Sequence, residues 1–218
     1  MILHYRKDTN KKLTVLVSST VYGIEELLDR IYTLLTQMGY EVWMSHKGTL
    51  PVFSDTSNVK NCIHAVEKCD VFLALITTRY GSGIVKSKGK AITHIELDKA
   101  IKLNKPRWIL AHDHVVFARQ LLRHIGYKTL EQREKLTLED NDELCDLRII
   151  DMYESCISSG TTYEEKVGDW VHTYASDDNA LLFATSQFYR YQEVEAFIKE
   201  QFTNKEKLFE DILKRGEE

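Results

Sequence analysis

Proline and glycine are scarce in this chain, with two prolines and ten glycines among 218 residues. Collagen-like, low-complexity and mostly disordered proteins have more of these residues or fewer apolar ones, and apolar residues make up 43% here. Cysteine is also rare, and its spacing matches no zinc-binding pattern. We therefore expect a packed core with reduced thiols at all four positions, Cys62, Cys69, Cys145 and Cys156.

The chain also lacks a long apolar run and a surplus of positive charge. It has no stretch of about 18 uncharged apolar residues, so we expect no segment to span a membrane. The polar segment 1–12 has no apolar centre of the kind that secretion signals contain, which predicts a cytoplasmic protein. The formal net charge is −4, whereas general nucleic-acid binders are usually basic. Neither a membrane nor a nucleic acid is an expected partner.

Short apolar runs alternate with segments of helical periodicity. The runs predict strands, of which 71–76 (VFLALI) is apolar throughout and suits the centre of a sheet. Strands that alternate with helices at this spacing indicate βαβ units and a parallel sheet. The predicted strands are 13–18, 41–44, 71–76, 107–111 and 168–174, and the predicted helices are 24–38, 59–66, 92–104, 115–125, 147–157, 177–188, 192–202 and 205–215.

The predicted fold class is α/β: a three-layer, flavodoxin-like sandwich with a parallel five-stranded sheet in the order 2-1-3-4-5. The expected domain organisation is a tail at 1–12, an α/β domain at 13–190 and a helical C-terminal extension at 191–218. Within the domain, 128–146 is a charged insert that we expect to be a solvated loop or surface helix.

Ligands of such sheets bind at the carboxyl ends of the strands, where three segments should meet: 18–23, 77–83 and 112–114. The first brings hydroxyls and a glycine to a helix start, where they could hold a phosphate or only cap the helix. The second opens a basic, glycine-containing loop, 79–90, which could attract phosphates or be an ordinary solvated loop.

Glu96 is the candidate that helical spacing brings to this edge. Thr93, Glu96 and Ala100 occupy adjoining positions on one helix face. A carboxylate with apolar neighbours there would be partly desolvated, and its pKa would rise. Alternatively, Glu96 is an acidic residue in the first turns of a helix that merely suits the helix dipole.

Three further sets of residues are candidates for chemistry. His112 and His114 could converge on a metal, but no third ligand is evident, so we expect no metal site and at most a pocket-lining His112. Cys62 and Cys69 lie on or beside an apolar helix stripe and are expected to be packing residues. The tryptophans fall in or beside predicted strands, which favours the core over a stacking platform: Trp43, Trp108 and Trp170.

Three stretches together resemble a bacterial TIR-like family of unknown function: VLVSSTVYGIEELL (15–28), CDVFLALITTRYGSG (69–83) and THIELDKAIKLNKPRWIL (93–110). That family is related to TIR NADases and to nucleoside 2-deoxyribosyltransferases, in which a Glu on the helix after the third strand's loop is catalytic. Thr93 stands where TIR NADases often have Cys, and Ser87 stands at their Ser position. The resemblance implies that Glu96 is the catalytic residue.

The expected function is therefore that of a TIR-like nucleotide N-glycosidase, an NAD-cleaving hydrolase or cyclase of bacterial immunity or phage defence. NAD would be a substrate, and no cofactor is expected. Two alternatives remain open: a non-catalytic module that senses a nucleotide or binds a protein, and a deoxyribosyltransferase-like enzyme. The expected partners are a nucleotide or nucleoside, further copies of the chain, and a protein of a defence system. The residues expected to hold the substrate are Ser18, Ser19, Thr20, Gly23, Thr77, Arg79, Tyr80, Gly81, Thr93 and His112.

Overall fold

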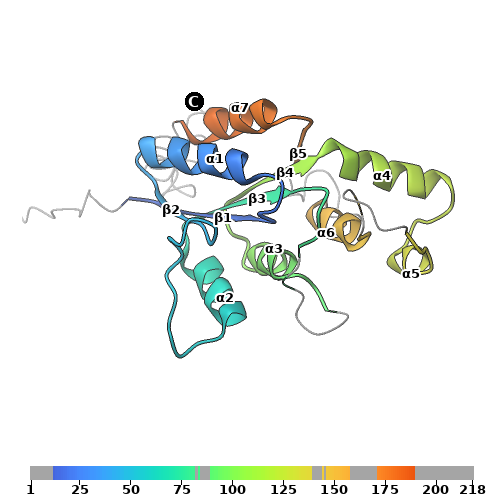
Figure 1. Ribbon diagram of the computed structural model, residues 1–218, viewed down its shortest axis with the longest axis horizontal. Coiled ribbons are helices and arrows are strands. Elements are labelled where there is room, and N and C mark those ends of the chain that lie inside the picture. The colour runs from blue at the N-terminus through green and yellow to red at the C-terminus, as the bar shows by residue number, and fades with distance from the viewer. Residues whose placement is uncertain are drawn as a thin grey trace, which may run out of the picture.

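The computed structural model describes residues 12–81, 83, 89–138, 144, 146–157 and 171–189. It contains a five-stranded parallel sheet in the order β2-β1-β3-β4-β5, as the sequence predicts (Figure 1). The expected central strand 71–76 is β3, and all six of its residues are buried. The strands are β1 (Thr14–Ser19), β2 (Glu41–Trp43), β3 (Val71–Ile76), β4 (Arg107–His112) and β5 (Val171–Tyr174).

Helices cover both faces of the sheet (Figure 1). One face carries α1 (Glu25–Gln37) and α7 (Asp177–Phe188), and the other carries α2 (Asn58–Lys68), α3 (Ile92–Lys102) and α6 (Arg148–Cys156). At the far end of the sheet, α4 (Asp113–His124) follows β4 and leads to the short α5 (Leu130–Arg133). None of these described helices is both long enough and apolar enough to cross a membrane.

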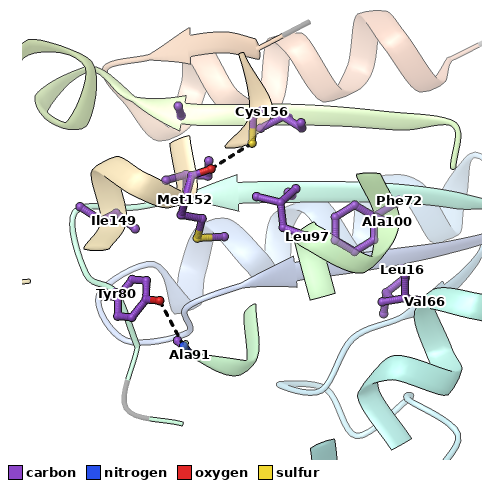
Figure 2. Packing of buried hydrophobic residues seen from close by; sticks show 14 of the residues in the cluster. Leu16, Val66, Phe72, Tyr80, Ala91, Leu97, Ala100, Ile149, Met152 and Cys156 are labelled. Carbon is purple, nitrogen blue, oxygen red and sulfur yellow. Dashed lines mark hydrogen bonds between the residues drawn. The ribbon is translucent and has the colours of Figure 1, made fainter. Parts of the chain in front are cut away.

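Alternation along the strands divides the core into two apolar layers. Along β3, Leu73 and Leu75 pack under α1 and α7, whereas Phe72 and Ala74 pack under α2, α3 and α6. Figure 2 shows the second layer, where Phe72 lies beside Leu97 and Ala100 of α3. Because successive side chains of a strand point to opposite faces, a strand buried on both sides must be apolar throughout.

Helix ends follow local chemistry at several points. Gly39 has a φ of +91° directly after α1, a conformation that a side chain would strain. Ser176 caps α7 by accepting a hydrogen bond from the Asn179 amide. The helix expected at 115–125 begins earlier, at Asp113, because His112 serves as its N-cap and accepts from the His114 amide.

The described part of the charged insert 128–146, which is 128–138, 144 and 146, is tied to the fold more firmly than a solvated segment would be. Residues 139–143 and Cys145 lie outside the described residues. The short helix α5 of the insert ends at Arg133, a buried side chain that donates to Asp151 and Glu154 of α6. Charge alone did not reveal this anchor, because a buried arginine needs partners that only the tertiary structure supplies. The predicted helices 192–202 and 205–215, most of the tail, Trp170 and Ser87 lie outside the described residues.

Candidate functional site

A cavity of about 480 Å³ opens at the carboxyl end of β1. Its volume lies within the roughly 300–1,000 Å³ that small-molecule sites occupy. α1 and α3 leave the sheet to opposite faces here, and this is the position where parallel sheets bind ligands. The cavity is lined by Leu16, Val17, Ser18, Ser19, Thr20, Val21, Tyr22, Ser45, Leu50, Val52, Asn58, Asn61, Cys62, Gly81, Gly83, Ala91, Ile92, Thr93 and Glu96.

Glu96 of α3 lines this cavity although its side chain is almost withdrawn from solvent, with 7% of the residue exposed. Burial raises the pKa of its carboxyl group, and hydrogen bonds from Ser18 and Cys62 oppose that rise without cancelling it. The Ser18 hydroxyl bonds directly to the carboxyl oxygen Oε2. The predicted rise in pKa is therefore present, and its main cause is desolvation.

The lining of the cavity carries little charge. Among its described residues, Glu96 is the sole Asp, Glu, Lys, Arg or His. The described part of the wall therefore offers a ligand one acid among hydroxyl, amide, thiol and apolar groups. Such a wall strengthens the interaction of that acid with any positive charge on the ligand, because little water screens it.

The segment after β1 lines the cavity but neither caps α1 nor offers a free phosphate site. Thr20 donates to the Arg79 carbonyl oxygen at 3.0 Å, and Ser19 donates to the Leu75 carbonyl oxygen at 3.1 Å. Among the residues that the structure describes, no side chain caps α1. The Gly23 amide donates to Glu25 at 2.9 Å, so a carboxylate of the protein already occupies the expected anion position. Gly23 itself does not line the cavity.

The segment after β3 contributes less of the wall than predicted. Gly81 lines the cavity, whereas Thr77, Arg79 and Tyr80 do not. The Thr77 hydroxyl accepts from the Arg79 amide at 3.1 Å and so shapes the local turn. The Arg79 guanidinium group lies against Gly23, where an added Cβ would stand 3.8 Å from its Nε.

Tyr80 points away from the cavity into a separate buried cluster. Its hydroxyl accepts from the Ala91 amide at 3.2 Å, as Figure 2 shows, and pairs with Nδ1 of His94 at 2.7 Å. The Arg148 guanidinium of α6 lies 4.7 Å from the centre of the tyrosine ring and donates to the Gly89 carbonyl at 2.7 Å. Tyr80 thus helps to fix the end of the loop 79–90 against α3 and α6.

The basic character of loop 79–90 is only partly visible in the described residues. Lys90 pairs with Asp98 of α3 at 2.5 Å, which places it on the helix rather than in the cavity. Lys86 and Lys88 lie outside the described residues. The described end of the loop therefore serves to anchor it to α3.

Thr93 offers the cavity an unused hydrogen-bonding group. Its Oγ1 is buried and, within the described part of the chain, has no hydrogen-bond partner. It precedes Glu96 by three residues, so the two side chains lie on one face of α3. Because an unsatisfied buried hydroxyl is unfavourable, a polar ligand group that pairs with Thr93 would gain binding energy.

His112 lies elsewhere, at the junction of β4 and α4. It does not line the cavity, and its ring packs 5.2 Å from that of Tyr174. The ligand atoms of His112, Asp113 and His114 lie within 4.8 Å of one another. This grouping follows from capping: Nδ1 of His112 accepts from the His114 amide, and the positive end of the α4 dipole disfavours a cation there.

The prediction that Cys62 is a buried packing residue is wrong. Its side chain is partly exposed, lines the cavity and hydrogen-bonds to Glu96, and burial raises its pKa to about 12. Val52 and Asn58 also line the cavity without having been predicted, and Tyr22 lines it from the predicted segment 18–23 although it was not among the expected substrate-holding residues. The strand order contained a signal for Cys62, Val52 and Asn58, because β2 neighbours β1 and the segment after β2 must reach the same edge of the sheet.

Residues 14–138 match the family model described as Domain of unknown function (DUF4062). The chain belongs to this family. The match includes Glu96 and every lining residue of the cavity, whereas α6 and β5 lie beyond it. No curated protein matches the chain. The family description names no activity.

Proposed function

We propose that this DUF4062 protein is a TIR-like N-glycosidase that cleaves NAD or a related nucleotide, with Glu96 as the catalytic carboxylate. The observation that carries the proposal is one buried carboxyl group, held by Ser18 and Cys62, on the wall of a cavity at the carboxyl edge of a parallel sheet. Buried carboxyls with raised pKa values in clefts are frequent catalytic groups.

The reaction needs little more than this carboxylate. As the bond between C1′ and the base nitrogen breaks, its electron pair goes to the nitrogen and positive charge develops at C1′ and the ring oxygen. An ionised Glu96 stabilises that charge or attacks C1′ to form a ribosyl ester. Water then completes hydrolysis, or a hydroxyl of the substrate completes cyclisation.

The leaving group suits a site whose described lining holds a single acid. The nicotinamide of NAD is cationic while bound to the sugar and leaves as a neutral molecule, so no second acid has to protonate it. Its positive charge would also favour the ionised form of Glu96 in the complex, offsetting the effect of burial on the pKa. Thr93 could pair with a sugar hydroxyl beside Glu96.

A deoxyribosyltransferase-like activity is a second candidate, and the lining of the cavity favours it. No described lining residue is cationic, so phosphates gain little inside, and the sugar and base of a nucleoside would fit without them. In that reaction the first base leaves with a proton as a 2-deoxyribosyl ester forms on Glu96. The deoxyribosyl group then passes to a second base instead of to water, and the second base gives up a proton.

A non-catalytic interaction module is a third candidate. Phe117 and Leu121 of α4 and Ile125 at its C-cap recur every four residues, and all three are exposed. An exposed apolar stripe of this kind is typical of an assembly surface. It supports the expected homo-oligomer or a partner protein in a defence system.

The test is cleavage of NAD and of a panel of nucleosides, with and without an acceptor base, measured as released base at increasing protein concentration. We expect release by the wild-type protein and loss of release in Glu96→Gln. The exposed Glu131→Gln on α5 is the matched control and should retain activity. Undiminished release by Glu96→Gln would remove the residue from its role, and binding of intact nucleotide without cleavage would favour the interaction module.

A further inference from the structure

Two exposed apolar side chains stand on the wall of the Glu96 cavity. Tyr22 comes from the β1–α1 connection and is 59% exposed, and Val52 comes from the β2–α2 connection and is 67% exposed. Phe53, the neighbour of Val52, is exposed as well. Large apolar groups gathered on a surface beside a cavity are typical of a ligand-binding surface.

The loop directly after Val52 is held in place by a buried side-chain amide. The Asn61 side chain of α2 accepts from the Phe53 amide at 3.0 Å. It also donates to the carbonyl oxygens of Phe53 and Thr56, at 3.1 and 3.2 Å. Three hydrogen bonds from one buried residue fix the loop, so the exposure of Val52 is a property of an ordered segment rather than of a loose one.

Tyr22 is held in a similar way by a tight turn. The Ile24 amide donates to the Val21 carbonyl at 3.2 Å, which closes the turn around Tyr22 and Gly23. Gly23 has a φ of +88°, and its amide is fixed by Glu25. Tyr22 therefore sits at the tip of a closed turn, and its phenol ring is exposed without being part of a flexible segment.

The cavity thus has two chemically different parts. Ser18, Thr93 and Glu96 supply hydroxyl and carboxyl groups, which suit the hydroxyls and the C1′ centre of a sugar. Tyr22 and Val52 supply an aromatic ring and a branched apolar group, which suit the faces of a flat ring. A molecule with a sugar at one end and an aromatic base at the other matches both parts.

We propose that Tyr22 and Val52 form the base subsite of this cavity and grip the aromatic base of an N-glycoside whose C1′ faces Glu96. The proposal rests on the N-glycosidase function and specifies how its substrate is recognised. Stacking is available from every base, so the subsite requires a flat aromatic base but discriminates little between bases.

The expected effects follow from the strength of stacking. Loss of one aromatic stack weakens binding by about 5- to 150-fold. Tyr22→Ala should show this loss, whereas Tyr22→Phe keeps the ring and should bind nearly as tightly as the parent. Val52→Ser should weaken binding by only a few-fold. Tyr189→Ala removes another exposed aromatic ring, 66% exposed at the C-cap of α7 and outside the cavity, and should leave binding unchanged.

The experiment is calorimetric titration in a Glu96→Gln background, which prevents turnover during the measurement. The probes are NAD, nicotinamide riboside and adenosine, with ribose 5-phosphate as the probe that has no base. We expect Tyr22→Ala to weaken binding of the three base-containing probes and to leave ribose 5-phosphate unchanged. Because Tyr22 and Val52 are exposed, the variants should fold like the parent, and circular dichroism melting checks this.

The outcomes separate this proposal from the one on which it rests. If the base-containing probes bind Tyr22→Ala as tightly as the parent, the base subsite is wrong, whatever the activity of the wild-type protein. If Tyr22→Ala weakens them but the wild-type protein cleaves no N-glycoside, the base subsite stands and the N-glycosidase function fails. If none of the probes binds, both proposals fail.

Discussion

Helix α3 carries two buried titratable side chains, His94 and Glu96, whose surroundings differ. His94 is 2% exposed and pairs with Tyr80, and its Nε2 lies 3.7 Å from Asp98. Burial lowers the pKa of His94 to about 4 and raises that of Glu96, so in both cases it disfavours the charged form. His94 is enclosed by protein groups, whereas Glu96 has a cavity in front of it.

This difference separates a structural residue from a functional candidate within one short motif. Two residues along a helix correspond to a rotation of roughly 200°, so His94 and Glu96 must face different neighbours. The His94 side of α3 meets Tyr80 and, through it, Arg148 of α6. The Glu96 side meets Ser18 of β1 and Cys62 of α2. A buried group becomes available for chemistry when a ligand can reach it, and burial alone does not provide this.

The largest expected effect is on Glu96. Glu96→Gln should lower the rate of base release by about 10²–10³-fold, since one transition-state charge interaction is lost. The stability of Glu96→Gln relative to the wild type should also increase as pH rises. The folded-state pKa of Glu96 lies above its ordinary 4.5, so the folded state binds a proton more tightly and wild-type stability falls as pH rises through that window.

Urea unfolding of the wild type and Glu96→Gln from acid to neutral pH measures this difference. The difference in unfolding free energy should move in favour of Glu96→Gln as pH increases. A constant difference across the range would mean that the carboxyl group titrates normally and is not desolvated.

The next effect concerns the other side of α3. Tyr80→Phe removes the hydroxyl that joins the Ala91 amide to His94 and leaves both partners buried. We expect a loss of about 1–3 kcal/mol in the unfolding free energy. Base release per folded molecule should stay near the wild-type rate, because Tyr80 does not line the cavity. A large fall in rate without a loss of stability would move Tyr80 into the site.

The pH dependence of stability near His94 should have the opposite sign to that of Glu96. Its pKa falls from 6.5 to about 4 on folding, so the unfolded chain binds more protons in that window and stability is lost as pH falls through it. Asp98 favours the charged form, whereas Lys90 and Arg148 oppose it. His94→Gln keeps an acceptor for Tyr80 but does not titrate. In this variant the unfolding free energy, measured with urea, should depend less on pH between about 4 and 6.5. If the unfolding free energy of His94→Gln varied with pH as steeply as that of the exposed His124→Gln control, the predicted role of His94 in the pH dependence would be wrong.

The smallest expected effect is that of Cys62. Cys62→Ala removes a hydrogen bond that lowers the pKa of Glu96, so that pKa should rise further. The acidic limb of the pH–rate profile should then move to higher pH, with a change of less than about tenfold in rate at neutral pH. Cys62→Ser restores a donor and should return the limb toward its wild-type position. Equal profiles for the alanine and serine variants would exclude the hydrogen bond as the cause.

Much of the fold followed from patterns that act over short distances. The apolar run of β3 and the helical periodicity of α1 each identified an element, and the strand order 2-1-3-4-5 was confirmed. Element boundaries were less accurate. α4 begins at Asp113 because His112 caps it, and this depends on where β4 ends rather than on periodicity.

The site was only partly predictable. Glu96, Thr93 and Ser18 came together at the carboxyl edge because helical spacing and sheet topology place them there. Tyr80 and His112 also follow strands that end at this edge, which is why they were predicted to hold the substrate. In the structure Tyr80 packs against His94, and His112 packs against Tyr174. Cys62 was assigned to packing because its helix stripe is apolar, and the stripe does not reveal which part of it faces a cavity.

The order of apolar and polar residues by itself determined the alternation of strands and helices, since hydrophobic periodicity acts within each element. It also brought a glutamate to the edge where parallel sheets bind ligands. The tertiary structure alone decided which buried polar groups find partners and which face an opening. Packing between distant segments sets that outcome: α6 meets Tyr80 on one side of α3, while β1, α2 and the loops after β1 and β2 leave the space beside Glu96.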